Sequence, residues 1–189
     1  MTKDAARLRT AASRAARTTT ALDSAATGLA AHDWTTLVAG SLVTCYAAMA
    51  GEPPTDVLIA RLEAAGIRVA LPIMGPQRSL TWGWYAADLQ HNDYGVRQPL
   101  PDPTINLAHM AAVILPAQRV GLDGTRLGRG AGYYDRALAA VPGAIKGGPL
   151  RIAVAFDDEV DDSVPHDAWD QPVDVIVTPT RILRLAQQG

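Results

Sequence analysis

Apolar residues gather in short runs along the chain, and each run is typical of a buried β-strand. Five such runs stand between turn-forming residues, at Ser41–Met49, Arg68–Ile73, Met110–Pro116, Leu150–Phe156 and Val173–Val177. Runs of this length that are nearly all apolar are characteristic of strands in a buried sheet. The pattern therefore predicts an α/β protein.

A helix is predicted between the first two of these strands. Val57, Leu58 and Leu62 recur at helical spacing, two prolines precede them, and Gly66 provides a stop. Proline near the first turn and glycine just past the last are common helix boundaries. We therefore expect a helix over Thr55–Ala65, and the resulting strand, helix and strand imply parallel strands joined by a right-handed crossover.

The first 31 residues predict a helix, or two helices with a break near Thr18–Thr20, because alanine, arginine, leucine and threonine dominate residues 3–31. Lys3 and Arg7 are four residues apart, so both cations project from one helix face. Such a pair suits an anionic ligand, but by pattern alone it is more typical of a solvent-exposed basic face.

Three further segments carry distinctive patterns. Leu80–Tyr85 alternates, which places Trp82 and Trp84 on one face of a strand, where packing is a commoner role than covering a flat ligand. Residues 87–106 are rich in glycine and proline and predict an irregular loop. The acidic segment 157–162 lacks the glycine spacing of a metal-binding loop, so we expect a solvated face.

Composition narrows the class of protein. The 17 basic and 19 acidic residues nearly balance, which gives no indication of a nucleic acid or a membrane surface as partner. Cys45 is the single cysteine; it allows no internal disulfide, suits a reducing compartment and is expected to be buried and inert. The N-terminal residues lack the apolar core of a signal peptide. We expect a cytoplasmic protein.

The segment Arg126–Arg136 reads RLGRGAGYYDR and has the composition of an anion-binding loop. Gly128, Gly130 and Gly132 allow positive φ angles, which lets successive backbone N–H groups point at one phosphate. A helix is predicted directly after the loop, over residues 133–141, and a helix N-terminus favours an anion. A glycine-rich turn without a ligand gives the same pattern.

Phosphate chemistry needs cations and, commonly, Mg²⁺. Arg126 and Arg129 can neutralise phosphate charge, and Asp135 with Asp174 can supply two carboxylates to Mg²⁺. Glu52 follows the carboxyl end of a predicted parallel strand, where open α/β sheets bind ligands, although it can also serve as an acid near a helix N-terminus. The four histidines show no metal-ligand spacing. These features favour phosphoryl transfer from a nucleotide.

The glycine-rich segment, preceded by VILP and followed later by DVIVT, resembles the 5-formyltetrahydrofolate cyclo-ligases, also called 5,10-methenyltetrahydrofolate synthetases. The spacings of Lys3 with Arg7 and of Glu52 with Thr55 are similar to further motifs of that family, in the same order. The resemblance implies a single three-layer α/β/α domain with a mainly parallel sheet, similar to ribose-phosphate isomerases and CoA-transferases. This domain would span residues 1–189, with an N-terminal helical segment (1–31) and an α/β core (32–189).

The resemblance also implies an activity: the ATP- and Mg²⁺-dependent conversion of 5-formyltetrahydrofolate, with one or several glutamates, to 5,10-methenyltetrahydrofolate. ATP would phosphorylate the formyl oxygen, N10 would attack the activated carbon, and ADP and phosphate would be released. The protein would be a monomer or a weak homodimer. Two alternatives stay open: a non-catalytic nucleotide- or folate-binding relative, and an ATP-dependent ligase or kinase acting on a related substrate.

Carried over by position, the resemblance assigns roles to individual residues. Arg129 and Tyr134 would be catalytic, and Asp135 and Asp174 would bind Mg²⁺. Folate would contact Glu52, Arg129, Gly130 and Tyr133. ATP would contact Lys3, Arg7, Arg126, Leu127, Gly128, Arg129, Gly130, Ala131, Gly132, Tyr133 and Tyr134.

Four positions depart from the family pattern. Gln98 stands in place of a glutamate, which removes a charge, and Gly121 stands where an aspartate is usual, with Asp123 two positions later. Ala131 occupies a position often held by glycine or lysine, and Trp169 a position usually held by histidine. These departures allow a changed rate or substrate.

Overall fold

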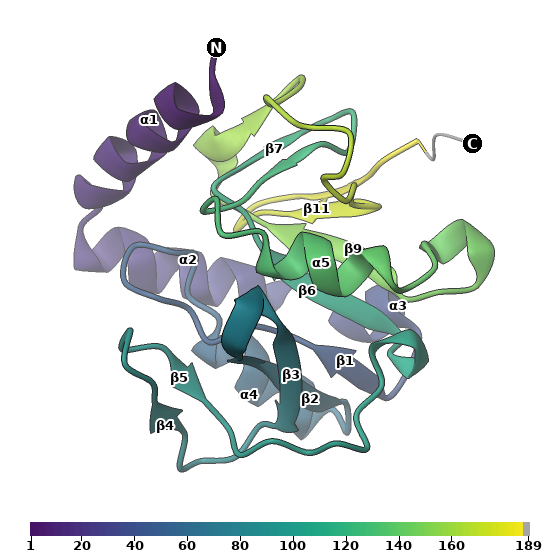
Figure 1. Cartoon of the computed structure of the whole chain (residues 1–189). Helices are drawn as coiled ribbons and strands as arrows, with labels where there is room; N and C mark the ends of the chain where they lie inside the picture. Colours follow the sequence, from purple (N-terminus) through teal and green to yellow (C-terminus); the bar gives the residue numbers. More distant parts are fainter. Residues whose placement is uncertain (187–189) are drawn as a thin grey trace.

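The structure is a computed structural model that describes residues 1–186, and its centre is a seven-stranded sheet in the order β12-β11-β9-β6-β1-β2-β3 (Figure 1). The sheet strands are β1 (Leu42–Thr44), β2 (Arg68–Met74), β3 (Leu80–Trp84), β6 (Ala112–Pro116), β9 (Leu150–Val154), β11 (Val175–Val177) and β12 (Ile182–Arg184). Strands β11, β9, β6, β1 and β2 are parallel, and the edge strands β3 and β12 are antiparallel to their neighbours. The predicted mixed α/β fold with a mainly parallel sheet is confirmed.

Five α-helices lie among the described residues: α1 (Lys3–Ala15), α2 (Thr19–Ala31), α3 (Trp34–Val38), α4 (Asp56–Ala64) and α5 (Tyr133–Ala139). Short 3-10 turns cover Pro76–Arg78, Leu107–His109, Ala144–Lys146 and Asp157–Glu159. The predicted break between the first two helices is confirmed. Thr18 is the N-cap of α2, and its side chain accepts a hydrogen bond from the amide of Ala21. Helix α4 falls within the predicted segment.

Both faces of the sheet are buried, as strand β6 illustrates. Helices α2, α3 and α4 lie on one face of the sheet and α5 lies on the other (Figure 1). Ala112 and Ile114 belong to the core with α2, α3 and α4, whereas Val113 and Leu115 belong to a second core that contains α5. Every residue from 112 to 115 is therefore inaccessible to water. This explains why the central strands read as continuous apolar runs.

The first strand is shorter than its apolar run predicted. It ends at Thr44, although the run continues to Met49. Beyond Cys45, side chains replace the ladder: the Thr55 hydroxyl donates to the carbonyl of Tyr46, and the amide of Met49 donates to the Glu52 carboxylate. The segment thus turns away from the sheet because local side-chain hydrogen bonds satisfy its backbone.

Two small sheets flank the large one. Strands β7 (Arg119–Gly121), β8 (Arg126–Leu127) and β10 (Val160–Asp161) form one, and β4 (Gln90–His91) and β5 (Arg97–Gln98) form a hairpin inside the segment predicted to be irregular. The sequence did not predict these pairs, because strands of two or three residues leave almost no periodicity to detect.

The acidic segment 157–162 is only partly the solvated face that we expected, since Asp158 and Asp162 are exposed but Glu159 is not. Glu159 is fully buried, and both of its oxygens accept hydrogen bonds from Arg14 on α1. Asp158 pairs with Arg17, and Asp161 pairs with Arg119. The prediction failed at Glu159 because its partner on α1, Arg14, lies 145 residues away in the sequence. The Arg14–Glu159 pair attaches the N-terminal helix α1 to the segment between β9 and β10.

Cys45 is buried as predicted, and burial raises the pKa of its thiol to about 12. Within residues 1–186, no helix has the length and apolarity needed to cross a membrane. The predicted single domain, its likeness to ribose-phosphate isomerases and CoA-transferases, and the cytoplasmic location stay predictions; residues 187–189 of that domain lie outside the described part.

Candidate active site

The order of strands along the sheet reverses between β6 and β1. From β1 the chain proceeds to β2 and β3 in one direction, and from β6 it proceeds to β9, β11 and β12 in the other. In open α/β sheets, ligands bind in the crevice beyond the carboxyl ends of the strands at such a point. A cavity of about 330 Å³ lies at this point, and residues that follow β1, such as Glu52, line it together with residues that follow β6, such as Gln118.

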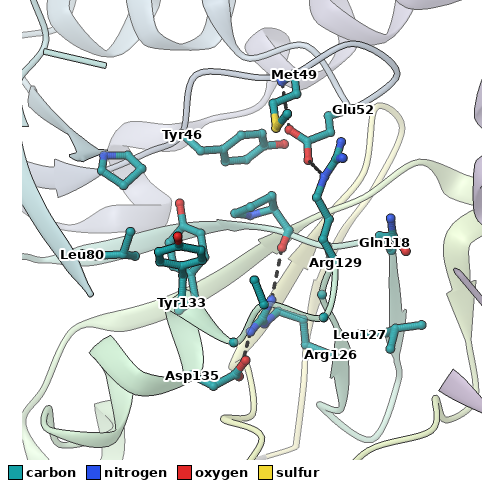
Figure 2. A pocket seen from close by; sticks show the side chains of 18 of the residues that line it. Tyr46, Met49, Glu52, Leu80, Gln118, Arg126, Leu127, Arg129, Tyr133 and Asp135 are labelled. Carbon is teal, nitrogen blue, oxygen red and sulfur yellow. Dashed lines mark hydrogen bonds and ion pairs between the residues drawn. The ribbon is translucent and has the colours of Figure 1, made fainter. Parts of the chain in front are cut away.

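The cavity has an apolar part and a polar part. Figure 2 shows Tyr46, Leu80 and Tyr133 on one side, and Arg129 reaching Glu52 on the other. The apolar part is completed by Met49, Pro72, Met74, Tyr94 and Val96. The polar part contains Lys3, Arg7, Arg126, Gly128, Arg129, Gly130, Ala131, Gly132 and Asp135. The cavity is thus suited to a ligand pair with one flat apolar member and one anionic member.

The glycine-rich loop takes the backbone conformation that its sequence requires. Gly130 and Gly132 have φ angles of 104° and 73°. A Cβ atom at Gly130 would lie only 3.3 Å from the guanidinium carbon of Arg7, which packs against the loop and donates a hydrogen bond from Nε to the carbonyl of Gly128. A side chain at residue 130 would therefore be strained and would displace a cation from the cavity.

Arg126 lies at the base of the loop and is only 4% exposed. It donates from one terminal nitrogen to Oδ1 of Asp135 at 2.8 Å and from the other to the carbonyl of Pro116 at 3.3 Å (Figure 2). Oδ1 of Asp135 also accepts from the amide of Gln171. The Arg126–Asp135 pair therefore ties both ends of the loop together and places a positive charge beneath it.

Arg129 extends across the cavity to Glu52 (Figure 2). Its Nε donates to Oε1 of Glu52 at 2.8 Å, while Oε2 of Glu52 accepts from the amide of Met49 at 2.9 Å. Glu52 is buried and Arg129 is half-exposed. The carboxylate is thus fixed, and it holds the guanidinium at the boundary between the polar and apolar parts.

Lys3 and Arg7 reach the cavity from the first two turns of α1, so the structure does not support a solvent-exposed basic face. Nζ of Lys3 contacts the carboxylates of Asp167 and Asp170. Burial lowers the pKa of Lys3, but the hydrogen bonds to the two aspartates outweigh it, so the pKa is raised. Lys3 therefore carries its positive charge at neutral pH.

Three buried polar atoms of the cavity have no hydrogen-bond partner in the described structure: the hydroxyl of Tyr134, Oε1 of Gln118 and Nε of Arg126. A buried polar atom without a partner costs free energy unless a ligand or water satisfies it. Burial also raises the pKa of Tyr134, so its hydroxyl stays protonated. These atoms are ready to bond a polar ligand.

The predicted magnesium ligands Asp135 and Asp174 do not line the same cavity. Asp135 lines the one described above. Asp174 directly precedes β11, at the amino end of the parallel strands; its Oδ2 accepts from the amide of Arg151, and it lines a second cavity of about 640 Å³. Among residues 1–186 no group of three His, Cys, Asp or Glu side chains could hold a metal. Asp135 directly follows the glycine-rich loop and is thus the predicted metal ligand that lies in this cavity, where Glu52 and Asp170 also place carboxylates.

Of the four departures, Ala131 and Trp169 line the cavity. Gln98 lies on β5, where its side-chain oxygen accepts from Asn92. At Gly121 an added Cβ would collide with the carboxylate of Asp123, which folds back into this space. The side chain of Asp123 therefore occupies the space beside Gly121, the position at which the sequence resemblance led us to expect an aspartate.

The other predicted site residues line this cavity, but sequence reasoning missed several neighbours. Gln118 and Tyr46 could have been found, because each follows closely the carboxyl end of a parallel strand at the reversal point. Tyr94 and Arg97 belong to the hairpin region that the sequence did not predict. Trp169 was noted only as a departure.

Comparisons with known proteins agree on one family. The profile of the 5-formyltetrahydrofolate cyclo-ligase family matches residues 3–179. A 5-formyltetrahydrofolate cyclo-ligase of Mycolicibacterium smegmatis is 34% identical over 154 residues, which is 76% of each chain. The Escherichia coli (strain K12) enzyme of the same name is 29% identical over 152 residues, covering 77% of this chain and 82% of its own.

A solved structure gives the same fold. The NMR structure of Aquifex aeolicus 5,10-methenyltetrahydrofolate synthetase superposes with a TM-score of 0.83 at 24% identity, and the match covers 100% of this chain and 95% of that one. The Mycoplasma pneumoniae 5,10-methenyltetrahydrofolate synthetase gives a TM-score of 0.71 at 20% identity, covering 95% and 99%. At these identities the likeness establishes the fold.

Proposed function

Since the chain belongs to the 5-formyltetrahydrofolate cyclo-ligase family, we propose that it converts 5-formyltetrahydrofolate to 5,10-methenyltetrahydrofolate, with ATP hydrolysed to ADP and phosphate. The observation that carries the proposal is the shape of one cavity. Its apolar part meets a cationic glycine-rich loop, and the Arg129–Glu52 pair stands where they join. Two ligands that must react with each other can meet at that boundary.

The chemistry explains why ATP is needed. A formyl oxygen is a poor leaving group, so N10 cannot displace it directly. In the proposed reaction the γ-phosphoryl group is transferred to that oxygen, N10 then attacks the activated carbon, and phosphate leaves with the oxygen as the ring closes. Such a reaction requires positioning and charge stabilisation more than covalent help from the protein.

The polar part of the cavity is proposed to bind the nucleotide. The backbone of residues 126–134 would surround the phosphates, and Lys3, Arg7 and Arg126 would neutralise them. This assignment is supported by the convergence of three cations from two segments on a loop that has positive φ angles at Gly130 and Gly132. Cations and backbone N–H groups together suit a polyphosphate.

The apolar part is proposed to bind the folate, with Tyr46, Leu80 and Tyr133 against its rings and Glu52 as hydrogen-bond acceptor for its N–H groups. Arg129 would leave part of its contact with Glu52 and bridge the γ-phosphate and the formyl oxygen, stabilising negative charge in the transition state. Gly130 lies next to it in the loop. Arg129 is therefore the catalytic residue of the proposal.

Tyr134 is proposed to act as a hydrogen-bond donor and not as a base. Its hydroxyl is buried, protonated and without a partner in the described structure. A neutral donor within the cavity can bond a phosphate or formyl oxygen as charge develops there. Its ring packs at 6.5 Å from that of Trp82, which fixes its position.

Mg²⁺ is proposed to bind through Asp135, phosphate oxygens and water. This arrangement fits the cavity, since Mg²⁺ commonly takes only one or two protein carboxylates in such sites and Asp135, directly after the loop, lines the cavity. When bound, Mg²⁺ would neutralise phosphate charge. Asp174 would need a conformational change to join it, because its cavity is the second one.

Absorbance at long wavelength tests the proposal, because the conjugated methenyl product absorbs there and the substrate does not. We expect the absorbance to rise when the protein is mixed with 5-formyltetrahydrofolate, ATP and Mg²⁺, and to stay flat when ATP is omitted. Binding of both ligands without product would instead indicate a non-catalytic relative.

A further inference from the structure

Trp169 is an exposed indole at the edge of the active-site cavity. It is 59% exposed, whereas Trp34 and Trp82 are buried in the two cores. It lies between β10 and β11 and lines the cavity together with Lys3 and Asp170. An indole that has no core to fill and faces a ligand cavity offers a flat surface for stacking.

The segment that carries Trp169 is held on both sides. Lys3 on α1 contacts Asp167 and Asp170 on either side of the indole, and its Nζ lies 5.0 Å from the centre of the ring. After Trp169, the amide of Gln171 donates to Asp135 on α5. The indole is thus pre-positioned, and a ligand that stacks on it loses little free energy in ordering the protein.

The direction of the nucleotide follows from the two parts of the cavity. The γ-phosphate must lie at Arg129, where the apolar part begins, because it is transferred to a group bound there. The rest of the nucleotide must then follow the loop away from the apolar part. Trp169 lies at this end, where an added Cβ on Gly132 would be 3.8 Å from its ring, and where Lys3 is its neighbour.

We propose that Trp169 is a positioning residue that stacks against the adenine base of ATP. The proposal rests on the proposed use of ATP and adds the part of the site that reads the base. Lys3, already adjacent to the ring, would neutralise the phosphate chain beside it.

Equilibrium titration calorimetry with two probes tests this role. Mg²⁺-ATP contains the base, and inorganic tripolyphosphate with Mg²⁺ presents the same charge without it. We expect Trp169→Ala to weaken ATP binding roughly tenfold, in line with the loss of one base-stacking contact. Trp169→Phe should stay within about threefold of the wild type. All proteins should bind tripolyphosphate equally.

Two outcomes overturn the proposal: unchanged ATP affinity in Trp169→Ala, or an equal loss for ATP and tripolyphosphate, which would mean that the residue only shapes the loop. Because Trp169 is exposed, its replacement removes no core contact.

Fluorescence provides a second measurement on the unaltered protein. ATP should quench the tryptophan emission, and tripolyphosphate should not. This difference between the two ligands should vanish in Trp169→Phe. It should persist in the control Trp84→Phe, because the Trp84 ring packs against Arg68.

Kinetics separates this proposal from the function on which it rests. Trp169→Ala should raise KM for ATP with a much smaller change in kcat. Product formation with an unchanged KM would overturn the stacking role alone. Selective loss of ATP affinity in a protein that forms no product would support the stacking role and contradict the ligase activity. Failure of the wild type to bind ATP would contradict both.

Discussion

Nε of Arg129 donates a hydrogen bond of 2.8 Å to Oε1 of Glu52, which joins two segments that are 77 residues apart in the sequence. One segment follows β1 and the other is the glycine-rich loop beyond β8. The bond connects the proposed nucleotide and folate parts of one cavity. A guanidinium held there by a buried carboxylate is positioned before the ligands arrive, which is the condition for effective electrostatic stabilisation.

Replacement of Arg129 tests its catalytic role. For Arg129→Ala we expect kcat to fall at least a hundredfold, because the cation at the reacting oxygens is lost. The side chain is half-exposed, but its removal leaves the buried Glu52 carboxylate with the Met49 amide as its remaining bonded partner, so the free energy of unfolding should fall by about 1–3 kcal/mol. Steady-state kinetics and urea unfolding measure the two effects. Turnover comparable to that of the wild type would exclude the assigned role.

A pair of aspartate variants tests the magnesium site. Asp135→Asn should raise the Mg²⁺ concentration needed for half-maximal activity several-fold, because Asp135 lies beside the loop. Asp174→Asn is the matched control, since Asp174 lines the second cavity. We expect its Mg²⁺ titration to be unchanged. A shift in both variants would instead support the two-carboxylate site predicted from the sequence.

The attachment of α1 depends on the buried pair of Arg14 and Glu159. Two nitrogens of Arg14 donate to the two oxygens of Glu159 at 2.7 and 2.9 Å. Arg14→Met would leave the fully buried carboxylate without its main partner, and we expect a loss of about 3–5 kcal/mol in the free energy of unfolding.

The exposed pair of Arg9 with Asp161 provides the control, and Arg9→Met should cost less than about 1 kcal/mol in urea unfolding. Equal losses in Arg14→Met and Arg9→Met would contradict the view that the buried pair holds α1. Because α1 carries Lys3 and Arg7, any folded Arg14→Met protein should also bind ATP more weakly.

Acid should weaken the ion pairs of the acidic segment 157–162. The hydrogen bond from Arg119 lowers the pKa of Asp161, and for Asp158 the hydrogen bonds from Arg17 and Ser13 outweigh burial, so that its pKa is lowered too. A carboxyl group whose pKa is lower in the folded protein than in the unfolded chain stabilises the folded state. This stabilisation is fully present above the pKa of the unfolded chain, about 4, and is lost as the pH falls through the pKa of the folded protein.

The urea midpoint should therefore decrease below about pH 4, where these two carboxylates become protonated. In Asp161→Asn, one contribution is already missing at neutral pH, so the protein should be less stable there and its decline with acid should be shallower. An unfolding profile parallel to that of the wild type across this pH range would rule out the contribution of Asp161.

The sequence predicted the features that depend on local pattern. Buried strands such as β6 and β9, helix α4, and the glycine-rich loop with its positive φ angles all follow from apolar runs, turn residues and glycine spacing. That Lys3 lines the cavity was expected only from the family resemblance, since its spacing from Arg7 favours a solvent-exposed face.

The features that the sequence did not predict depend on contacts between distant segments of the chain. Glu159 of the acidic segment is buried against Arg14 of α1, and the short strands β7 and β8 exist because they pair with each other. Asp174 was expected beside the loop because its residue type suits Mg²⁺, but its position depends on the strand direction of β11, which puts it at the amino edge.

Transfer of oxygen from substrate to phosphate tests the central claim most directly. If the formyl oxygen is phosphorylated at Arg129, then 5-formyltetrahydrofolate labelled with oxygen-18 in the formyl group must give labelled phosphate in the same amount as the methenyl product. Mass spectrometry of the phosphate, measured alongside the long-wavelength absorbance, decides the matter. We predict one heavy oxygen in each phosphate released, and product formation with unlabelled phosphate would contradict the proposed mechanism.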